Sequence, residues 1–177
     1  FHQWTPDAYE GAPHPIAGFM SVATKGVALI ALMRIFPGLL AGGESVLGVK
    51  LRLAIALAAA LTMVVGNLTA LVQTNVKRML AYSAVAQAGY IAVGFAAFTT
   101  EGIAAALFYS LLYLLMNAAA FLVVARVAAD GTNPTLEDLR GLHRRAPLLA
   151  ATLLLQSFLF SPGLPHLFCS FSLVYCC

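Results

Sequence analysis

The sequence predicts an all-α protein, a polytopic bundle of membrane helices, and two observations carry this prediction. Hydrophobic residues make up 61% of the 177 positions and charged residues only 10%, and the mean hydropathy is +0.88. A soluble domain carries about a quarter charged residues. The apolar residues also stand in long blocks rather than in short alternating runs. Long blocks favour spanning helices over a membrane β-barrel.

A helix that spans a bilayer needs roughly 20 mostly apolar residues. By that measure the sequence predicts about five spanning helices, near residues 15–36, 51–73, 79–98, 102–127 and from about 147 onward. Links are expected at 37–50, 74–78, 99–101 and 129–146. In the last and longest link, the segment 136–142 is expected to form an amphipathic turn at the surface.

A short helical segment, the half-helix, is expected before the first spanning helix. Thr5 suits the N-cap and Pro6 the first helical position, while Gly11 is able to end the turn and Pro13 prevents its continuation. Half of a broken membrane helix would show this pattern. An ordinary interfacial turn would show it too, and composition alone favours the turn.

The basic residues predict which links share a side of the membrane. The links after the second and fourth helices hold six basic residues, and the opposite side holds three. Because basic residues concentrate in cytoplasmic loops, we expect 74–78, 129–146 and the half-helix on the cytoplasmic side. The six are Lys77, Arg78, Arg126, Arg140, Arg144 and Arg145, and the three are Arg34, Lys50 and Arg52.

Lys25 lies about ten residues into the first spanning helix, near the middle of the bilayer. A lysine at that depth costs on the order of 2.5–3.5 kcal/mol on insertion scales, so it is a candidate functional residue. An ammonium is able to load and release a proton as its surroundings change. The alternatives are a structural ion pair and snorkelling, and the central position disfavours snorkelling.

Further polar side chains recur at helical spacing inside the apolar segments. Ser83, Gln87 and Tyr90 share a face of the third helix, and Tyr113 and Asn117 stand four residues apart on the fourth. Such groups order water or join neighbouring helices by hydrogen bonds. Taken alone, the interhelical role is favoured.

The motifs that signal other functions are missing from the sequence. It contains no nucleophile elbow, no glycine-rich phosphate loop and no basic stripe for nucleic acid. The three cysteines, Cys169, Cys176 and Cys177, lack the paired spacing of a metal site. The four histidines lie in or near links or in the tail. We therefore expect neither a metal nor a redox cofactor in this chain.

Two runs of the sequence carry a specific resemblance. The first is residues 1–13, Phe-His-Gln-Trp-Thr-Pro-Asp-Ala-Tyr-Glu-Gly-Ala-Pro. The second is residues 67–83, Asn-Leu-Thr-Ala-Leu-Val-Gln-Thr-Asn-Val-Lys-Arg-Met-Leu-Ala-Tyr-Ser. Both resemble the subunit N family of proton-pumping NADH:quinone oxidoreductase, complex I, whose mitochondrial counterpart is subunit 2. Met116-Asn117 and the run Asp-Leu-Arg-Gly-Leu at 138–142 fit the same family, and the resemblance extends to about residue 157.

The resemblance implies roles for several residues. Family members have about fourteen helices in two inverted repeats with broken helices near the midplane, so 5–11 corresponds to the second part of a broken helix. Lys25 falls on the central lysine of the family's eighth helix, which implies a proton relay. Gln87, Tyr113 and Asn117 form a candidate water-ordering path. Gln87 stands where the family often has His, and Tyr113 and Asn117 stand where the sister subunits L and M carry His and Lys.

The implied function is that of a membrane-arm subunit of an enzyme, a proton-translocating NADH:quinone oxidoreductase. Its implied partners are the other membrane subunits of complex I, the lipid bilayer and protons, in a bacterial inner membrane and without nucleic acid. NADH, FMN, iron–sulfur clusters and quinone are expected in partner subunits. The alternatives are a subunit of a multi-subunit cation/proton antiporter, and a purely structural anchor or nonfunctional fragment.

Both ends of the chain are expected to depart from the complete subunit. The chain opens on Phe1 without an initiator Met, and the family's glutamate on its fifth helix and lysine on its seventh are expected upstream. We predict a central antiporter-like membrane domain at 1–157 and an aberrant or frameshifted tail at 158–177 that continues the fifth helix of this chain. There Gly163-Leu164-Pro165 fits the family, but the Gly-Phe-Phe-x-Lys run is missing. Translating the coding DNA in its other frames tests this.

Overall fold

The computed structural model describes residues 4–40, 46–97, 99–128, 133–135, 137–139 and 141–160. In these ranges the elements are helices, joined by short links, and Asn75 and Thr135 of two links form an isolated antiparallel β-bridge. The elements are α1 (Thr5–Gly11), α2 (His14–Leu40), α3 (Val46–Leu71), α4 (Val76–Ala96), α5 (Thr100–Val127), the 3-10 helix η1 (Glu137–Leu139), α6 (Leu142–Arg145) and α7 (Pro147–Phe160). Four of them, α2 to α5, are long and apolar enough to cross a membrane. The predicted all-α membrane bundle is confirmed for this part of the chain.

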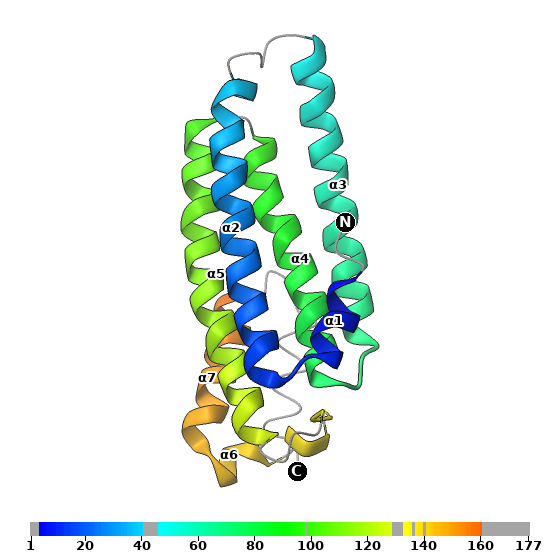
Figure 1. Cartoon of the computed structure of the whole chain (residues 1–177), viewed down its shortest axis with the longest axis vertical. Helices are drawn as coiled ribbons and strands as arrows, with labels where there is room; N and C mark the ends of the chain where they lie inside the picture. The colour runs from blue at the N-terminus through cyan, green and yellow to red at the C-terminus, as the bar shows by residue number, and fades with distance from the viewer. Residues whose placement is uncertain are drawn as a thin grey trace.

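The four long helices run alternately up and down (Figure 1). α4 packs against α3 on one side and α5 on the other, and α5 also packs against α2. The short helix α1 lies against the lower part of α4, and α6 and α7 lie at the lower end of α5 (Figure 1). The predicted fifth spanning helix begins at Pro147, and its described part, α7, reaches Phe160. The predicted tail beyond that residue lies outside the described ranges.

The link predicted at 37–50 is shorter in the structure. α2 continues through Pro37 to Leu40, and α3 begins at Val46. Proline removes one backbone donor without having to end a membrane helix, since neighbouring groups are able to satisfy the freed carbonyl. Lys50 and Arg52 therefore lie on α3, with exposed side chains. Long cationic side chains near a helix end reach out of the apolar layer, so they are tolerated there.

The start of α4 also differs from the prediction, because Lys77 and Arg78 belong to its first turn rather than to a link. Asn75 has an extended backbone, and its side-chain oxygen accepts from the backbone N–H groups of Lys77 at 3.0 Å and Arg78 at 3.4 Å. An asparagine N-cap of this kind satisfies donors that a helix start leaves free. The cap therefore begins the helix at Val76, ahead of the predicted residue 79.

The half-helix α1 begins at Thr5, and its N-cap residue is Trp4, so the prediction of Thr5 as the N-cap is wrong by one position. Trp4 has helical backbone angles and makes no side-chain cap. Pro6 in the first turn has no N–H to satisfy, which reduces the need for a capping oxygen. Gly11 ends the helix and α2 starts at His14, as the predicted break requires.

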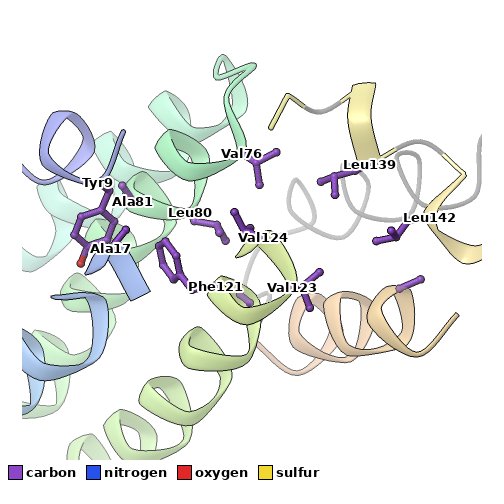
Figure 2. Packing of buried hydrophobic residues seen from close by; sticks show 12 residues of the cluster. Tyr9, Ala17, Val76, Leu80, Ala81, Phe121, Val123, Val124, Leu139 and Leu142 are labelled. Carbon is purple, nitrogen blue, oxygen red and sulfur yellow. The ribbon is translucent and has the colours of Figure 1, made fainter. Parts of the chain in front are cut away.

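A cluster of apolar side chains joins the short helices to the lower end of the bundle (Figure 2). Tyr9 of α1 packs edge-on against Phe121 of α5, with ring centroids 5.7 Å apart and planes at 78°. Of the described residues in the segment 136–142, Glu137 and Asp138 are exposed while Leu139 and Leu142 are buried in this cluster, so the predicted amphipathic turn is confirmed for these residues. The cluster consists of Tyr9, Ala17, Val76, Leu80, Ala81, Ala120, Phe121, Val123, Val124, Leu139, Leu142 and Ala150.

Small residues let α3 and α4 approach closely. A Cβ atom added to Gly66 would lie 2.7 Å from the backbone nitrogen of Ala86, and one added to Gly89 would lie 3.0 Å from the carbonyl oxygen of Ala59. Membrane helices associate through such close backbone contacts, because burial from water supplies no driving force between them. Gly66 and Gly89 therefore allow the close packing of α3 and α4.

Candidate functional site

Lys25 faces Tyr113 because α2 and α5 run antiparallel from a close crossing at Gly18. A Cβ atom added to Gly18 would lie 3.1 Å from Cβ of Phe121. Lys25 is seven residues further along α2, and Tyr113 is eight residues back along α5. Two helical turns take about seven residues, so both side chains return to the sides of the helices that face each other.

The Lys25 ammonium is held by neutral groups. Its Nζ donates to the hydroxyl oxygen of Tyr113 at 2.8 Å and to the backbone carbonyl oxygen of Ala84, on α4, at 3.0 Å. The same nitrogen lies 4.7 Å from the centre of the Tyr113 ring, so a cation–π interaction supplements the hydrogen bond. An ammonium has three N–H donors, and these contacts use two. In the described part of the chain no carboxylate pairs with Lys25, and its head group turns into the bundle rather than snorkelling outward.

A second polar contact joins α4 and α5 at the neighbouring level. The Tyr109 hydroxyl donates to the side-chain oxygen of Gln87. Tyr109 lies one turn before Tyr113 on α5, and Gln87 lies three residues after Ala84 on α4. Tyr109 is not among the predicted site residues. The signal that would have identified it is the four-residue spacing of Tyr109, Tyr113 and Asn117, which places all three on one side of a helix.

Asn117 is the most buried of the predicted site residues, with 2% of its surface exposed, and Tyr113 is 5% exposed. The Asn117 side-chain nitrogen has no acceptor among the described residues. A buried amide without a partner costs about 1–3 kcal/mol, so such groups normally bind ordered water or another polar group. The structure thus brings the predicted residues to neighbouring levels of the α2–α4–α5 packing, with Lys25 and Tyr113 in direct contact.

Tyr90 makes its side-chain hydrogen bond to α3. Asn67 of α3 donates from its side-chain nitrogen to the Tyr90 hydroxyl at 3.3 Å. This contact joins α3 and α4, which is the interhelical role that the sequence favours for polar groups taken alone. Gln87 and Tyr90, which lie three residues apart on α4, therefore serve opposite neighbours.

A separate polar cluster at the lower end of the bundle attaches α1 to the start of α4. Lys77 is 2% exposed. Its Nζ donates to the backbone carbonyl oxygens of Glu10 at 3.1 Å and Ala12 at 2.9 Å. Lys77 and Arg78 lie in the first turn of α4, where the helix macrodipole makes positive charge unfavourable. This unfavourable position is the sequence signal that both side chains bind groups outside their own helix.

Arg78 adds two ion pairs to the same attachment. Its guanidinium nitrogens lie 2.9 Å from a carboxylate oxygen of Glu10 and 3.2 Å from one of Asp7. The second Glu10 oxygen accepts from the side-chain nitrogen of Asn75 at 3.2 Å. Both oxygens of one carboxylate on α1 are therefore bound by residues at the start of α4.

The segment that follows α5 reaches this end as well. The Val76 N–H donates to the Pro134 carbonyl oxygen at 3.1 Å, and Asn133 donates from its side chain to the Glu10 carbonyl oxygen at 3.3 Å. Residues 74–78, residues 133–135 and the half-helix thus share one end of the bundle, as the charge pattern predicts. Placement of that end in the cytoplasm stays a prediction.

Metal ligands are not gathered in the described ranges, where no three His, Cys, Asp or Glu side chains lie close enough to hold an ion. The three cysteines lie outside those ranges. The chemistry available around Lys25 is therefore that of an ammonium, two phenols and two amides.

The sequence matches a family model over residues 1–176, described as NADH:quinone oxidoreductase/Mrp antiporter, TM. The match continues past residue 157, and the division of the chain at that residue stays a prediction. The chain is 46% identical over 165 residues to NADH-quinone oxidoreductase subunit N of Moorella thermoacetica, covering 93% of this chain and 34% of that protein. It therefore spans about a third of the length of this relative.

Two solved structures share the fold. One is the membrane-bound sulfane sulfur reductase, an archaeal respiratory membrane complex, with a TM-score of 0.78, 32% identity, and coverage of 96% of this chain and 34% of that one. The other is respiratory complex I from Thermus thermophilus with bound aureothin, with a TM-score of 0.72, 37% identity, and coverage of 98% and 38%. The expected resemblance to subunit N is confirmed, and the chain belongs to the NADH:quinone oxidoreductase/Mrp antiporter family of membrane subunits.

Proposed function

We propose that this chain is part of a membrane-arm subunit of NADH:quinone oxidoreductase, and that Lys25 relays protons within it. The observation that carries the proposal is the setting of the Lys25 ammonium. It lies mid-helix in an apolar bundle, bound by a tyrosine hydroxyl and a backbone carbonyl, and among the described residues these two contacts use two of its three N–H donors. An ionisable group at mid-depth in a membrane helix is expensive to maintain without a function.

The contact with Tyr113 gives the relay a direction across the bundle. A phenol hydroxyl accepts one hydrogen bond and donates another. When Lys25 gives its proton to the Tyr113 oxygen, the phenol releases its own proton to the next acceptor, and the tyrosine stays neutral. The lysine is left as a neutral amine, ready to take a proton through its remaining donor position. Asn117 lies one turn further along α5, where its buried amide is suited to hold a water molecule on this route.

The redox chemistry belongs to partner subunits in this proposal. NADH, FMN, the iron–sulfur clusters and quinone are held there, and this chain holds none of them. Its partners are the other membrane subunits, the lipid bilayer and protons, in a bacterial inner membrane. A relative named NADH-quinone oxidoreductase subunit N and a structural neighbour that is a respiratory complex I support this assignment.

Replacement of Lys25 by methionine tests the relay. In membranes that carry the assembled complex, K25M should abolish NADH-driven proton uptake through this subunit while the complex still assembles. The matched control is R34M, which removes one positive charge from an exposed position on the same helix and should leave pumping unchanged. Full proton pumping by an assembled K25M complex would overturn the relay role.

The second candidate function is a subunit of a multi-subunit cation/proton antiporter, because the matching family description includes Mrp antiporters. It predicts proton movement that is driven by a Na⁺ gradient and persists when NADH oxidation is blocked. Proton movement that requires NADH oxidation and ignores the Na⁺ gradient favours the leading proposal. Absence of proton movement in both assays, from a wild-type chain in an assembled complex, would favour the nonfunctional fragment.

A further inference from the structure

We infer that Lys77 and Arg78 are positioning residues, which hold the half-helix α1 so that α2 and α5 cross at the register that pairs Lys25 with Tyr113. The inference rests on the proposed relay function, since its effect on activity passes through that pair. From the sequence alone, these two cations serve only to predict which side of the bundle faces the cytoplasm. The inference gives them a structural role as well. The evidence is a chain of contacts from Lys77 to Phe121.

The first step is the capping of α1 by Lys77. A helix leaves its last carbonyl groups without partners and carries partial negative charge at that end. α1 has only seven residues, fewer than the roughly 12–15 that an isolated helix needs, so it depends on outside contacts. The buried Lys77 ammonium binds the carbonyl oxygens of Glu10 and Ala12, which belong to the last turn and the cap of α1. The Lys77 ammonium at the start of α4 thus balances the partial negative charge at the C-terminal end of α1.

The second step is the orientation of α1 by Arg78. Its guanidinium bridges Asp7 and Glu10, which lie three residues apart on α1 and so project from the same side of that helix. Asp7 is 71% and Glu10 33% exposed at the side chain, so these ion pairs contribute little stability and mainly fix the rotation of α1. Lys77 therefore attaches α1 to α4, and Arg78 fixes the rotation of α1 about its own axis.

The third step leads from α1 to the proton-transfer pair. Tyr9, one residue before Glu10, is 1% exposed and packs against Phe121 (Figure 2). Phe121 is also the residue against which Gly18 of α2 rests. If α1 were displaced, the Tyr9 ring would move away from Phe121, where α2 and α5 cross. This crossing determines which residue of α2 faces Tyr113. A small shift of this crossing would lengthen the Lys25–Tyr113 hydrogen bond.

The test compares K77M with K77R and with the control R126M in the assembled membrane complex. Arg126 is an exposed cation in the last turn of α5, and it makes no ion pair with the described residues of α1. K77M should lower protons pumped per electron by roughly tenfold, as small misplacements of reacting groups do, while NADH:quinone electron transfer continues. K77R retains the cation and should restore most of the coupling, and R126M should behave as wild type.

A spin label reports the position of α1 independently of pumping. Gly11 is exposed and a Cβ atom there would meet nothing within 4 Å, so G11C accepts the label in a background whose cysteines are serine. The label should be immobile in the wild-type complex and mobile in K77M. Lost coupling with an immobile label, or a mobile label with full coupling, would overturn the positioning role. Full pumping in K25M would instead overturn the relay, whatever the label reports.

Discussion

The side-chain nitrogen of Lys25 and the hydroxyl oxygen of Tyr113 lie 2.8 Å apart, and the same nitrogen lies 4.7 Å from the centre of the tyrosine ring. One residue of α5 therefore offers the half-buried cation both a hydrogen-bond acceptor and a π face. The two contributions are separable, because phenylalanine keeps the ring and removes the hydroxyl. The hydroxyl is the part that a proton relay needs.

Replacing Tyr113 by phenylalanine should slow proton pumping by roughly 10- to 100-fold, which corresponds to the loss of about 1.5–3 kcal/mol that a hydrogen bond to a charged group contributes. The complex should still assemble, since the ring and its cation–π contact remain. NADH-driven acidification of vesicles measures the effect. F108L, an exposed change on the same helix, is the control and should pump normally. Wild-type pumping in Y113F would show that the hydroxyl takes no part.

Replacing Gly66 by alanine should destabilise the α3–α4 pair by about 1–3 kcal/mol, the usual effect of overpacking. The new Cβ atom would lie 2.7 Å from the Ala86 backbone nitrogen, and backbone is unable to move aside as a side chain does. Thermal denaturation of the detergent-solubilised complex, followed by loss of assembly, measures the change. G11A is the matched control, because its Cβ atom would meet nothing within 4 Å. Equal stability of the two variants would contradict the close packing.

Much of the fold follows from the length and position of apolar blocks in the sequence. Such blocks locate α2 to α5 within a few residues, and the cost of a central charge singles out Lys25. The four-residue spacing of Tyr113 and Asn117 correctly places them on one side of α5. These are local properties, since each depends on residues within one helix.

The partners of these residues are not local, and the sequence alone does not supply them. Ala84 lies 59 residues and Tyr113 88 residues from Lys25 along the chain, and hydropathy does not say which helices are neighbours. Lys77 illustrates a second limit. Its acceptors are backbone carbonyl oxygens, which every residue possesses and no side-chain pattern marks. A count of charges therefore assigns Lys77 to membrane orientation and leaves its contact with α1 unseen.

Replacing Asn75 by alanine should destabilise the complex by more than the same change at Thr99. Both are N-cap residues, and loss of a cap costs about 1 kcal/mol. Among the described residues, the Thr99 hydroxyl accepts from the Gly102 N–H at 3.0 Å, whereas the Asn75 side chain caps α4 and also donates to Glu10 of α1. Denaturation midpoints of N75A and T99A make the comparison. A larger effect at Thr99 would show that the bond to Glu10 contributes nothing.

Asp138 should make the segment before α6 sensitive to acid. One Asp138 carboxylate oxygen accepts from the backbone N–H and the hydroxyl of Thr135, each at 2.8 Å. These two bonds to the charged form hold the pKa of Asp138 below its ordinary value. The folded segment therefore binds the proton less readily than the open one. Its stabilisation is complete above the ordinary aspartate pKa of about 3.9 and is lost as the pH falls through the lowered value.

Hydrogen exchange at the Thr135 amide, corrected for the intrinsic pH dependence of exchange, measures this loss. Protection in the wild-type chain should be constant from neutral pH to about pH 5 and should fall below the ordinary aspartate pKa of about 3.9. Asparagine at position 138 keeps an acceptor oxygen but has no proton to bind in this range, so D138N should show weaker protection that does not change with pH. Thr135 to valine removes only the hydroxyl bond and should leave a smaller acid effect in place. A D138N chain that loses protection over the same pH range as the wild type would assign the acid effect to another group.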